Sequence, residues 1–351
     1  MRFSDDGREG DNMTEKTLIW GAGAVGGTVG AFLVRAGYAV TFVDVSRDHV
    51  DAIRDPSRGL RISGPVDAVM IIAPAATPER VEGTWTRVFL AVKAQDTEEA
   101  CRALAPHLAK DGYVLSLQNG LCETIIASIV GCQRTVGAFV NFGADWMAPG
   151  EIVYSNRGAV VLGEIDGKVT ARLRELHTQL QAFEPDAMIT EHIWSYLWGK
   201  LGYGALLFAQ ATGQLGIADC LARPELLPLW RDLAGEAVEV ALAEGTEPRG
   251  FNGYDPAAFR PGATEEDLRD SVAAMVAFNR PNAKTHSGVW RDLAIRKRRT
   301  EVDVQIASIV HVGGRHGIAC PKLVALVRMI HEIEDGKRPL SDDNLYELLH
   351  A

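Results

Sequence analysis

The sequence predicts a two-domain α/β protein, in which a domain built on a parallel sheet precedes a helical domain. Three observations support this fold class: a glycine-rich stretch that directly follows a short apolar run, further apolar runs that alternate with helical segments to about residue 189, and a change to mostly helical periodicity from residue 190. Such alternation is typical of a parallel sheet with helices on its faces. A chain of 351 residues is long enough for two domains, each with its own core.

The chain begins with a polar stretch that precedes the first apolar run. Residues 1–13 lack the apolar core of a signal peptide, so we expect a disordered leader, and Met13 is a second candidate for the true start. The first domain is then expected at residues 14–189 and the helical domain at residues 190–351.

Composition narrows the classes of partner. The formal net charge of −10 argues against a nucleic-acid partner, because that affinity comes largely from Lys and Arg neutralising phosphates. No apolar run is long enough to span a bilayer. The five cysteines form no CxxC pair, which fits reduced thiols in a cytoplasmic protein better than disulfides or a metal site.

The glycine-rich stretch has the order of elements that a dinucleotide site requires. An apolar run at 16–20 ends on Gly21, and Gly21, Gly23 and Gly26 follow the GxGxxG spacing before a helical segment. The first glycine makes the tight turn, the second lets the backbone approach the pyrophosphate, and the third lets the helix pack on the strand. The helix N-terminus then offers free N–H groups to the phosphates. The sequence thus predicts a Rossmann dinucleotide-binding domain, with a cofactor site formed by Gly21, Gly23, Ala24, Val25 and Gly26.

Asp44 bears on the choice of cofactor. It ends the next apolar run, 18 residues beyond Gly26, near the spacing of about 20 that is expected for an acid on the ribose. A carboxylate there accepts hydrogen bonds from the ribose hydroxyls and repels a 2′-phosphate, so NAD(H) is favoured. Arg47 lies close enough to hold such a phosphate, which leaves NADP(H) open.

Five further apolar runs are predicted as strands, at 69–75, 87–93, 112–119, 135–142 and 159–165. Ligands bind beyond the carboxyl ends of strands in such sheets, and two polar residues occupy those ends. These are Lys93 and Asn119. The alternative for each is a polar residue that simply begins a turn, and Asn119–Gly120 is a common turn pair.

A lysine stands out in the first helix of the second half. Ile193, Leu197 and Leu201 are spaced four apart on one apolar stripe, and Lys200 sits one position off that stripe with Gly204 one turn further on. Burying an ammonium is costly unless it is paired. The alternative is a side chain that reaches from a surface helix to water.

The remaining segments are predicted from composition and periodicity. An amphipathic helix ends at Gly245, a loop rich in Pro, Gly and acids follows, and another helix runs from Thr264 to about Phe278. The basic run Arg296 to Arg299 is interpreted as a solvated helix face or an anion-binding patch.

With these segments in order, the chain resembles the ketopantoate reductase (2-dehydropantoate 2-reductase) family. The resemblance covers nearly the whole chain beyond the leader, and seven short motifs carry it: "GAGAVGG", "AVKAQDT", "LQNG", "WGKL", "THSGVWRDL", "RRTEVD" and "RHGIACP". It implies a Rossmann domain followed by a helical domain related to the 6-phosphogluconate dehydrogenase group. It also implies an active site in the cleft between them, where a nicotinamide cofactor reduces a 2-keto acid.

The resemblance also assigns roles to residues. Lys200 takes the place of the catalytic lysine that polarises and protonates the ketone oxygen. Glu301 matches the glutamate that hydrogen-bonds the substrate hydroxyl. Asn119, included among the catalytic candidates, and Lys93 match residues that line the nicotinamide and substrate pocket, and Ser287 matches a serine near the substrate carboxylate.

The chain departs from the family where the substrate binds. Gly204 and Phe208 replace asparagines that bind substrate, and Ile306 and Ala307 replace an Asn-Gly pair after the glutamate. These changes predict a more apolar pocket that admits a bulkier or aromatic substrate. One extra residue lies between Asp292 and Glu301, the loop at 246–270 is longer than usual, and Asp44 occurs where the family places the NADPH arginine.

The expected function is hydride transfer between a nicotinamide cofactor and a 2-keto or 2-hydroxy acid, with 2-dehydropantoate itself as one possible substrate. An opine- or β-hydroxyacid-type dehydrogenase and a non-catalytic dinucleotide-binding regulator remain alternatives. The expected partner is a small carboxylic or hydroxy acid, with no nucleic acid, membrane or metal, and the helical domain makes a homodimer plausible.

Overall fold

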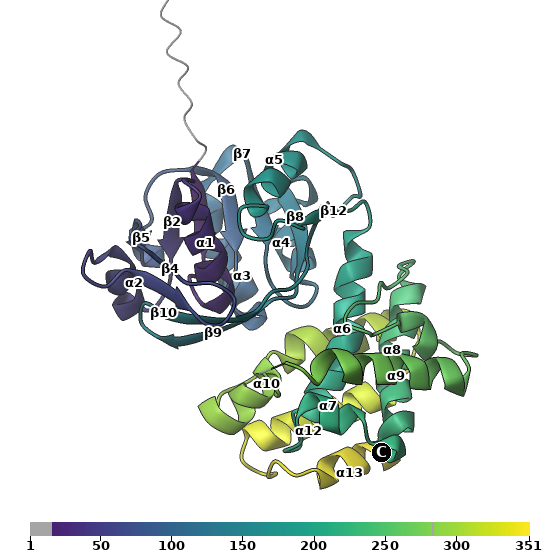
Figure 1. Cartoon of the computed structure of the whole chain (residues 1–351). Coiled ribbons are helices and arrows are strands. Elements are labelled where there is room, and N and C mark those ends of the chain that lie inside the picture. Colours follow the sequence, from purple (N-terminus) through teal and green to yellow (C-terminus); the bar gives the residue numbers. More distant parts are fainter. Residues whose placement is uncertain (1–15, 283) are drawn as a thin grey trace, which may run out of the picture.

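The computed structural model describes residues 16–282 and 284–351, so the predicted leader at 1–13 lies outside the described residues. An eight-stranded sheet in the order β12-β11-β8-β7-β6-β1-β2-β5 forms the centre of the first half (Figure 1). Six of its strands run parallel: β1 (Thr17–Trp20), β2 (Val40–Val43), β5 (Ala75–Ala76), β6 (Trp85–Leu90), β7 (Leu108–Ser116) and β8 (Thr135–Val140).

Helices cover both faces of this sheet, as the alternating pattern predicts. In β1, Ile19 packs into the core under α1 and α5, whereas Leu18 and Trp20 pack into the core under α3 and α4. Both sides of each central strand are therefore apolar, which is typical of a parallel sheet. The helices of this half are α1 (Ala24–Arg35), α2 (Arg47–Arg54), α3 (Thr97–Leu104), α4 (Cys122–Val130) and α5 (Ala171–Leu180), and the 3-10 turns are η1 (Pro78–Arg80), η2 (Ala94–Asp96), η3 (Ala105–His107) and η4 (Cys132–Arg134).

The structure corrects two details of the predicted sheet. The run at 69–75 is not one strand, because Pro74 divides it into β4 (Val69–Ile71) and β5, which belong to different sheets; a proline cannot donate to the ladder. The sheet is also not wholly parallel. Two of its strands, β11 (Val160–Glu164) and β12 (Met188–Ile189), run opposite to the other six. The second sheet contains β4 together with β3 (Leu60–Ser63), β9 (Gly143–Ala148) and β10 (Glu151–Asn156).

The antiparallel part of the main sheet follows from the second sheet. After β8 the chain leaves the main sheet and builds the hairpin β9–β10, which joins β3 and β4 in a four-stranded sheet. It then returns as β11, antiparallel to β8. A parallel return would need a crossover connection to the other end of the sheet. The hairpin instead brings the chain back to the end where β8 finishes, so β11 runs in the opposite direction to β8.

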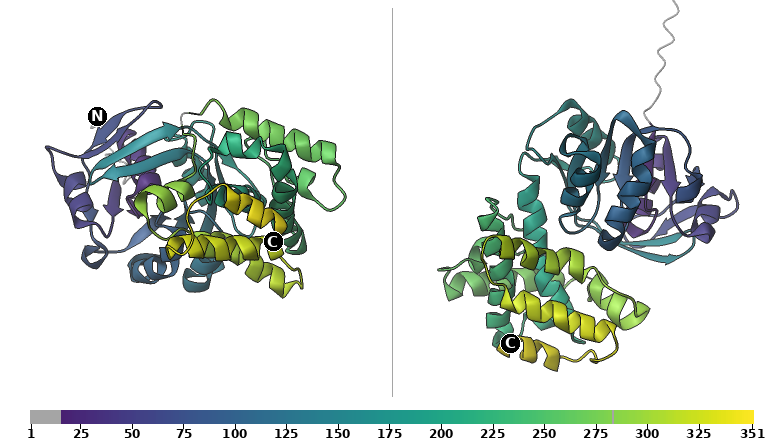
Figure 2. Two further views of the ribbon diagram at one scale, coloured as in Figure 1. Left: turned by 90° about the horizontal axis from the view of Figure 1, so that it is seen from below. Right: turned by 180° about the vertical axis from the view of Figure 1, so that it is seen from behind.

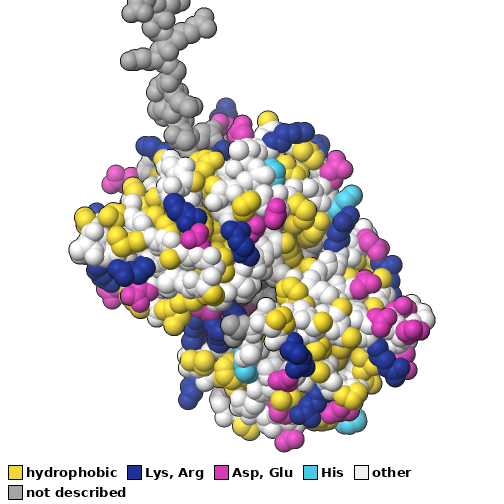
Figure 3. Space-filling view, in the orientation of Figure 1, with side chains coloured by type: hydrophobic (Ala, Val, Ile, Leu, Met, Phe, Trp, Pro, Cys, Tyr) yellow, Lys and Arg dark blue, Asp and Glu magenta, His cyan; other side chains and the backbone are white. Residues whose placement is uncertain are grey.

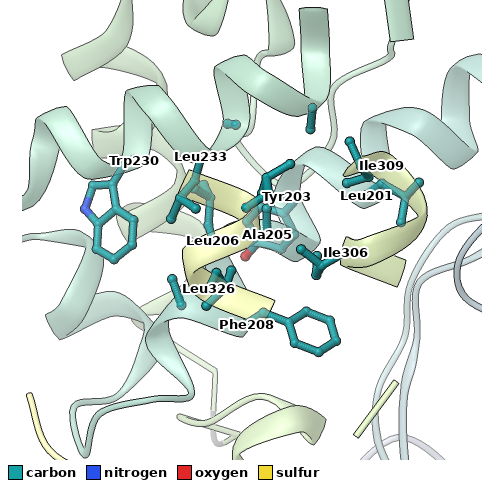
Figure 4. Close-up of a cluster of buried hydrophobic side chains, with 14 of the residues drawn as sticks. Leu201, Tyr203, Ala205, Leu206, Phe208, Trp230, Leu233, Ile306, Ile309 and Leu326 are labelled. Carbon is teal, nitrogen blue, oxygen red and sulfur yellow. The ribbon is translucent and has the colours of Figure 1, made fainter. Parts of the chain in front are cut away.

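The second half is helical and packs around α6 (Ile193–Gln210) and α8 (Leu227–Ala243) (Figures 1 and 2). Figure 4 shows Trp230 and Leu233 of α8 in the same buried cluster as Leu206 of α6. The predicted helix from Thr264 is confirmed as α9 (Glu265–Asn279), with Thr264 and Asp267 forming a capping box. The other elements are α7 (Ile217–Leu221), η5 (Pro224–Leu226), η6 (Pro256–Phe259), α10 (Gly288–Arg291), α11 (Ser308–Arg315), α12 (Pro321–Glu334), α13 (Asp343–His350) and two π-helical turns, η7 (Asp292–Arg296) and η8 (Asp303–Ala307). None of the helices in the described ranges is long and apolar enough to cross a membrane.

Helix α6 connects the two halves and fixes their relation. Its first turn packs on the main sheet, where Ile193 lies over glycines in β8 and β11. A Cβ atom on Gly137 would come within 3.0 Å of Ile193 Cγ1, and one on Gly163 within 2.7 Å of Ile193 Cβ. The two glycines thus let the helix approach the sheet closely. Lys200, two turns beyond Ile193, is carried to the end of β8 as a result.

Candidate active site

A cavity of about 850 Å³ lies between the two halves and is lined by residues of both. Figure 3 shows the hollow between the two lobes of the molecule. Its walls come from the glycine-rich loop, from the ends of β2, β6, β7 and β8, from α6, and from the segment that contains Ser287 and Glu301. Ligands in open α/β sheets bind beyond the carboxyl ends of the strands, and the cavity occupies that position.

The glycine-rich loop has the shape of a phosphate cradle. Gly21 has a φ of +101°, and a Cβ there would lie 2.6 Å from Val92 N, so another residue would be strained. A Cβ on Gly23 would meet no described atom within 4 Å, which leaves this side of the loop open to the cavity. Gly23 is also the N-cap of α1 and supplies no side-chain cap, so the first amides of α1 stay available to an anion.

The members of the predicted cofactor set do not all face the cavity. Gly21, Gly23, Ala24 and Val25 line it. Gly26 does not, because it packs under the loop: a Cβ there would lie 2.0 Å from Gly21 O. Gly26 therefore acts through helix–strand packing, which is the role its position in the motif predicts.

Asp44 also lines the cavity, beyond the end of β2. Its two carboxylate oxygens accept hydrogen bonds from Ala22 N at 3.0 Å and from Ser46 N at 2.9 Å. These bonds fix the carboxylate beside the glycine-rich loop. Arg47 points elsewhere, since its guanidinium lies 3.5 Å from the exposed carboxylate of Glu79 and is not part of the cavity wall.

A buried histidine that sequence reasoning missed braces this loop. His49 Nδ1 accepts a hydrogen bond from Gly150 N at 2.9 Å, so Nε2 carries the proton and donates to Ala22 O at 2.8 Å. The ring also packs edge-on against Trp146, at a centroid distance of 6.0 Å. The second sheet thereby supports the loop. No local pattern around His49 marks this role, because its partners are distant in the sequence.

Glu301 is held at the end of β6 by two donors. Its Oε1 accepts a hydrogen bond from Ala94 N at 2.8 Å, and its Oε2 lies 3.2 Å from Lys93 Nζ. Lys93 Nζ is also 3.5 Å from Asp292 Oδ2. All three side chains line the cavity. The structure thus brings together two residues that the sequence placed at a common site although they are 208 positions apart.

Lys200 enters the same cavity from α6. Its Nζ donates to the carbonyl of Val140, the last residue of β8, at 2.5 Å and lies 5.5 Å from the centre of the Phe139 ring. Burial lowers the pKa of Lys200 to about 8, although the negative charges of Glu301 and Glu123 oppose that change. The side chain therefore does not extend to bulk water, as it would on a surface helix.

Comparison with known proteins identifies the family of the chain. A family model described as "Ketopantoate reductase PanE/ApbA" matches residues 17–167, and its C-terminal counterpart matches residues 192–334. The chain is 31% identical to a 2-dehydropantoate 2-reductase of Archaeoglobus fulgidus, over 92% of this chain and 99% of that protein. A 2-dehydropantoate 2-reductase of Pyrococcus abyssi is 30% identical, over 92% of this chain and 100% of that protein.

The chain belongs to the ketopantoate reductase family. It is accordingly an NAD(P)-dependent oxidoreductase, with the Rossmann and helical domains that the family implies. A solved ketopantoate reductase of Ralstonia eutropha JMP134 has a TM-score of 0.76 and 28% identity, over 92% of this chain and 99% of that one. A structure of D-mandelate dehydrogenase with NADH and anilino(oxo)acetate has the same fold, with a TM-score of 0.79 and 23% identity over 92% and 99% of the two chains.

The segment in which the resemblance predicts one extra residue has an unusual backbone. Between Asp292 and Glu301 the helix widens into the π turn η7, and Lys297 then takes a left-handed conformation with a φ of 48°. A π turn accommodates one additional residue without breaking the helix. Burial disfavours the charge on Asp292, but Lys93, Arg296 and Arg298 outweigh it and lower the pKa of that carboxyl.

The basic run therefore does not form the helix face that was one of its two interpretations. Arg296 and Arg298 each lie 2.9 Å from Asp292 Oδ1. Arg299 instead pairs with Glu334 and Asp335 at the end of α12. Arg296 and Arg298 also line the cavity.

The other predicted site residues of this ketopantoate reductase relative also line the cavity. Asn119 follows β7, Ser287 is the N-cap of α10, and Gly204 and Phe208 lie on α6. Ser287 Oγ accepts a hydrogen bond from Trp290 N at 3.1 Å. A Cβ on Gly204 would meet only Gln305 Oε1 among the described atoms, at 3.8 Å, so this position has room for a side chain. Other apolar or aromatic side chains that line the cavity are Tyr203, Leu207, Phe251 and Val289.

One ionic cluster across the cavity was missed by sequence reasoning. Asp145 of β9 lies 3.4 Å from Lys284 Nζ and 3.9 Å from Arg296, and it pairs closely with Arg291. Burial lowers the pKa of Lys284, and the carboxylate of Asp145 partly offsets the effect. The cluster ties the second sheet to the helical half.

Proposed function

We propose that this protein reduces 2-keto acids with apolar or aromatic side chains to 2-hydroxy acids, with NADH as the favoured cofactor and Lys200 as the proton donor. The observation that carries the proposal is the Lys200 amine, which lines the cavity and donates a hydrogen bond to Val140 O. A lysine whose pKa is about 8 is mostly protonated at neutral pH and still releases its proton readily.

The residues of the cavity have separate tasks in this reaction. A bound nicotinamide supplies the hydride, and the protein supplies position and charge. Lys200 polarises the ketone oxygen and transfers a proton to it. Glu301, fixed by Ala94 N and Lys93, accepts a hydrogen bond from the 2-hydroxyl group that forms as the ketone is reduced. The hydroxyl oxygen of Ser287 is already an acceptor for Trp290 N, so its own hydrogen is free to be donated to the substrate carboxylate.

The proposed substrate class rests on Gly204 and Phe208, which stand where the family resemblance places asparagines. Gly204 offers no polar group, and Phe208 adds an aromatic ring to a wall that also contains Leu207 and Phe251. Apolar pockets take up ligands by burying apolar area, so a phenyl or branched side chain is favoured over the hydroxylated chain of 2-dehydropantoate. The D-mandelate dehydrogenase with this fold is named for an aromatic hydroxy acid. The relatives named 2-dehydropantoate 2-reductase make 2-dehydropantoate the second candidate.

The preference for NADH rests on Asp44. Its carboxylate lines the cavity beside the cradle, where the ribose of a bound dinucleotide has its hydroxyls. A 2′-phosphate would meet this negative charge, and Arg47 is already paired with Glu79. NADH is therefore expected to give the higher kcat/KM.

The test is turnover with a panel of acids. Purified protein is mixed with NADH or NADPH and either phenylglyoxylate or 2-dehydropantoate, and cofactor absorbance is followed. We expect Lys200→Ala to lower kcat at least about a hundredfold while NADH binding is retained. Lys110→Ala, which removes an exposed lysine from β7, serves as the matched control.

Several outcomes would contradict the proposal. Unchanged kcat in Lys200→Ala would remove the lysine from the mechanism. Turnover that requires an added amino acid would favour an opine-type dehydrogenase, and NADH binding without turnover on any acid would favour a regulatory protein. A higher kcat/KM for 2-dehydropantoate would overturn the proposed substrate class.

A further inference from the structure

A buried glutamate that does not line the cavity lies close to the first turn of α6. Glu123 is in the first turn of α4, and its side chain is 0% exposed. Among the described residues, the polar side chain close enough to favour its charged form is Ser116, and the two groups make no hydrogen bond of normal geometry. A buried acid with so few partners costs free energy, so a stable protein keeps one only where something offsets that cost.

The surroundings of Glu123 are formed by three elements that meet behind the active site. On β8, Gly137 faces it directly, because a Cβ there would lie 3.6 Å from Glu123 Oε1 and 3.0 Å from Ile193 Cγ1. On β7, the hydroxyl of Ser116 is close by and partly opposes the effect of burial on the pKa of Glu123. From α6 comes Lys200, two turns after Ile193 on the same side of the helix.

Among the described residues, Lys200 is the charged group that lowers the pKa of Glu123. Glu301 and, to a smaller extent, Glu123 raise the pKa of Lys200 against the effect of burial. Strand β8 contributes no ionisable side chain. The neighbouring thiol of Cys122 and the thiol of Cys101, which packs against α4 from α3, stay neutral because burial raises the pKa of each. On η4, Arg134 is bonded to the carbonyls of Ala109 and Gly112.

We propose that Glu123 is a positioning residue for Lys200: its carboxylate is a buried counter-charge that helps to keep the amine protonated, together with Glu301, which lines the cavity. This inference rests on the proposed role of Lys200 as proton donor. It means that a residue outside the cavity helps to set the pKa of the Lys200 amine.

Glu123 and Lys200 ionise in neighbouring pH ranges. Burial raises the pKa of Glu123 to about 7, and burial lowers that of Lys200 to about 8. Below pH 7 the acid is mostly neutral and has little effect on the amine. Above pH 7 it is charged, and its negative charge favours a proton on Lys200 that burial alone would release. The effect of Glu123 on the reaction is therefore confined to the alkaline side.

The experiment compares the pH dependence of NADH-driven reduction in the wild type and in Glu123→Gln, which keeps the shape and removes the charge. We expect the alkaline midpoint of kcat to fall by on the order of one pH unit, the size of shift that one nearby buried charge produces. The rate would then be nearly unchanged at pH 6 and about eightfold lower at pH 8.5. Glu123→Asp, which keeps a carboxylate, should restore part of the shift. Glu98→Gln, which removes an exposed carboxylate on α3, should leave the midpoint in place.

An unchanged midpoint in a folded Glu123→Gln variant would overturn the inference. Carbonyl ¹³C NMR gives a second test that does not need this variant: in Lys200→Met the Glu123 signal should titrate at higher pH than in the wild type, and an equal midpoint would overturn the inference as well. Failure of the proposed function looks different. It would appear as no acid-dependent NADH oxidation by the wild type, or as full activity in Lys200→Ala.

Discussion

The stability of Glu123→Gln should depend on pH in a direction that the structure specifies. An ordinary glutamate has a pKa of 4.5, and burial raises that of Glu123 to about 7. Between these values the folded protein binds a proton that the unfolded chain has lost. The wild type therefore loses stability as the pH rises from about 4.5 to about 7. Glutamine carries no such proton and does not contribute this loss.

The size of the effect follows from the shift. One pKa unit is about 1.4 kcal/mol, so the charged carboxylate costs about 3 kcal/mol of folding free energy once it is fully ionised. Relative to the wild type, the variant should gain up to this amount between pH 5 and pH 8. For folding units of 150–250 residues this is a rise of roughly 6–12 °C in melting temperature.

The assay is thermal unfolding followed by circular dichroism at pH 5 and pH 8. Glu98→Gln serves as the control, because Glu98 is an exposed glutamate on α3 paired with Arg102; its difference from the wild type should change little between the two pH values. A variant of Glu123 that becomes less stable than the wild type on going from pH 5 to pH 8 would refute the reasoning. It would mean that the carboxylate is well solvated or paired in the folded state.

Three further predictions concern activity. Because the pKa of Lys200 is lowered to about 8, the rate of reduction should fall about tenfold for each pH unit above 8. The rate of oxidation, which needs the neutral amine, should rise through the same pH range. Both rates are read from NADH absorbance, and a flat pH profile would contradict the role of Lys200. Gly204→Asn should raise kcat/KM for 2-dehydropantoate relative to phenylglyoxylate several-fold, because the position has room and gains a polar group; equal changes for both acids would count against it. Gly21→Ala should weaken NADH binding at least about tenfold in a fluorescence titration, because the φ of +101° and the 2.6 Å approach to Val92 N would strain the turn. Gly37→Ala is the control: Gly37 also has a positive φ, but a Cβ there meets open space, so NADH binding should stay intact.

Much of the site could be read from the sequence because its signals are local. The glycine spacing, the acid at the end of the next strand and the polar residues after β6 and β7 each depend on a few neighbouring positions. The capping box at Thr264 is another such signal, and the structure confirms the helix it predicts. Lys200 stood out because a lysine interrupts an apolar helix.

Other features could not be predicted because they depend on residues far apart in the chain. The direction of β11 is decided by the hairpin β9–β10, which has to return to the sheet from the opposite side. Asp145 finds Arg291 across 146 positions, and no pattern near either residue indicates the other. The burial of Glu123 likewise arises only when α4, β8 and α6 come together.

By itself, the sequence determined that this chain folds as a Rossmann domain with a helical partner, because short spacings and periodicities dictate turns, helices and strands. The tertiary structure decided how acidic the amine of Lys200 is. That property depends on how completely water is removed and on which carboxylates lie near, and both are set by the packing of distant segments around one side chain.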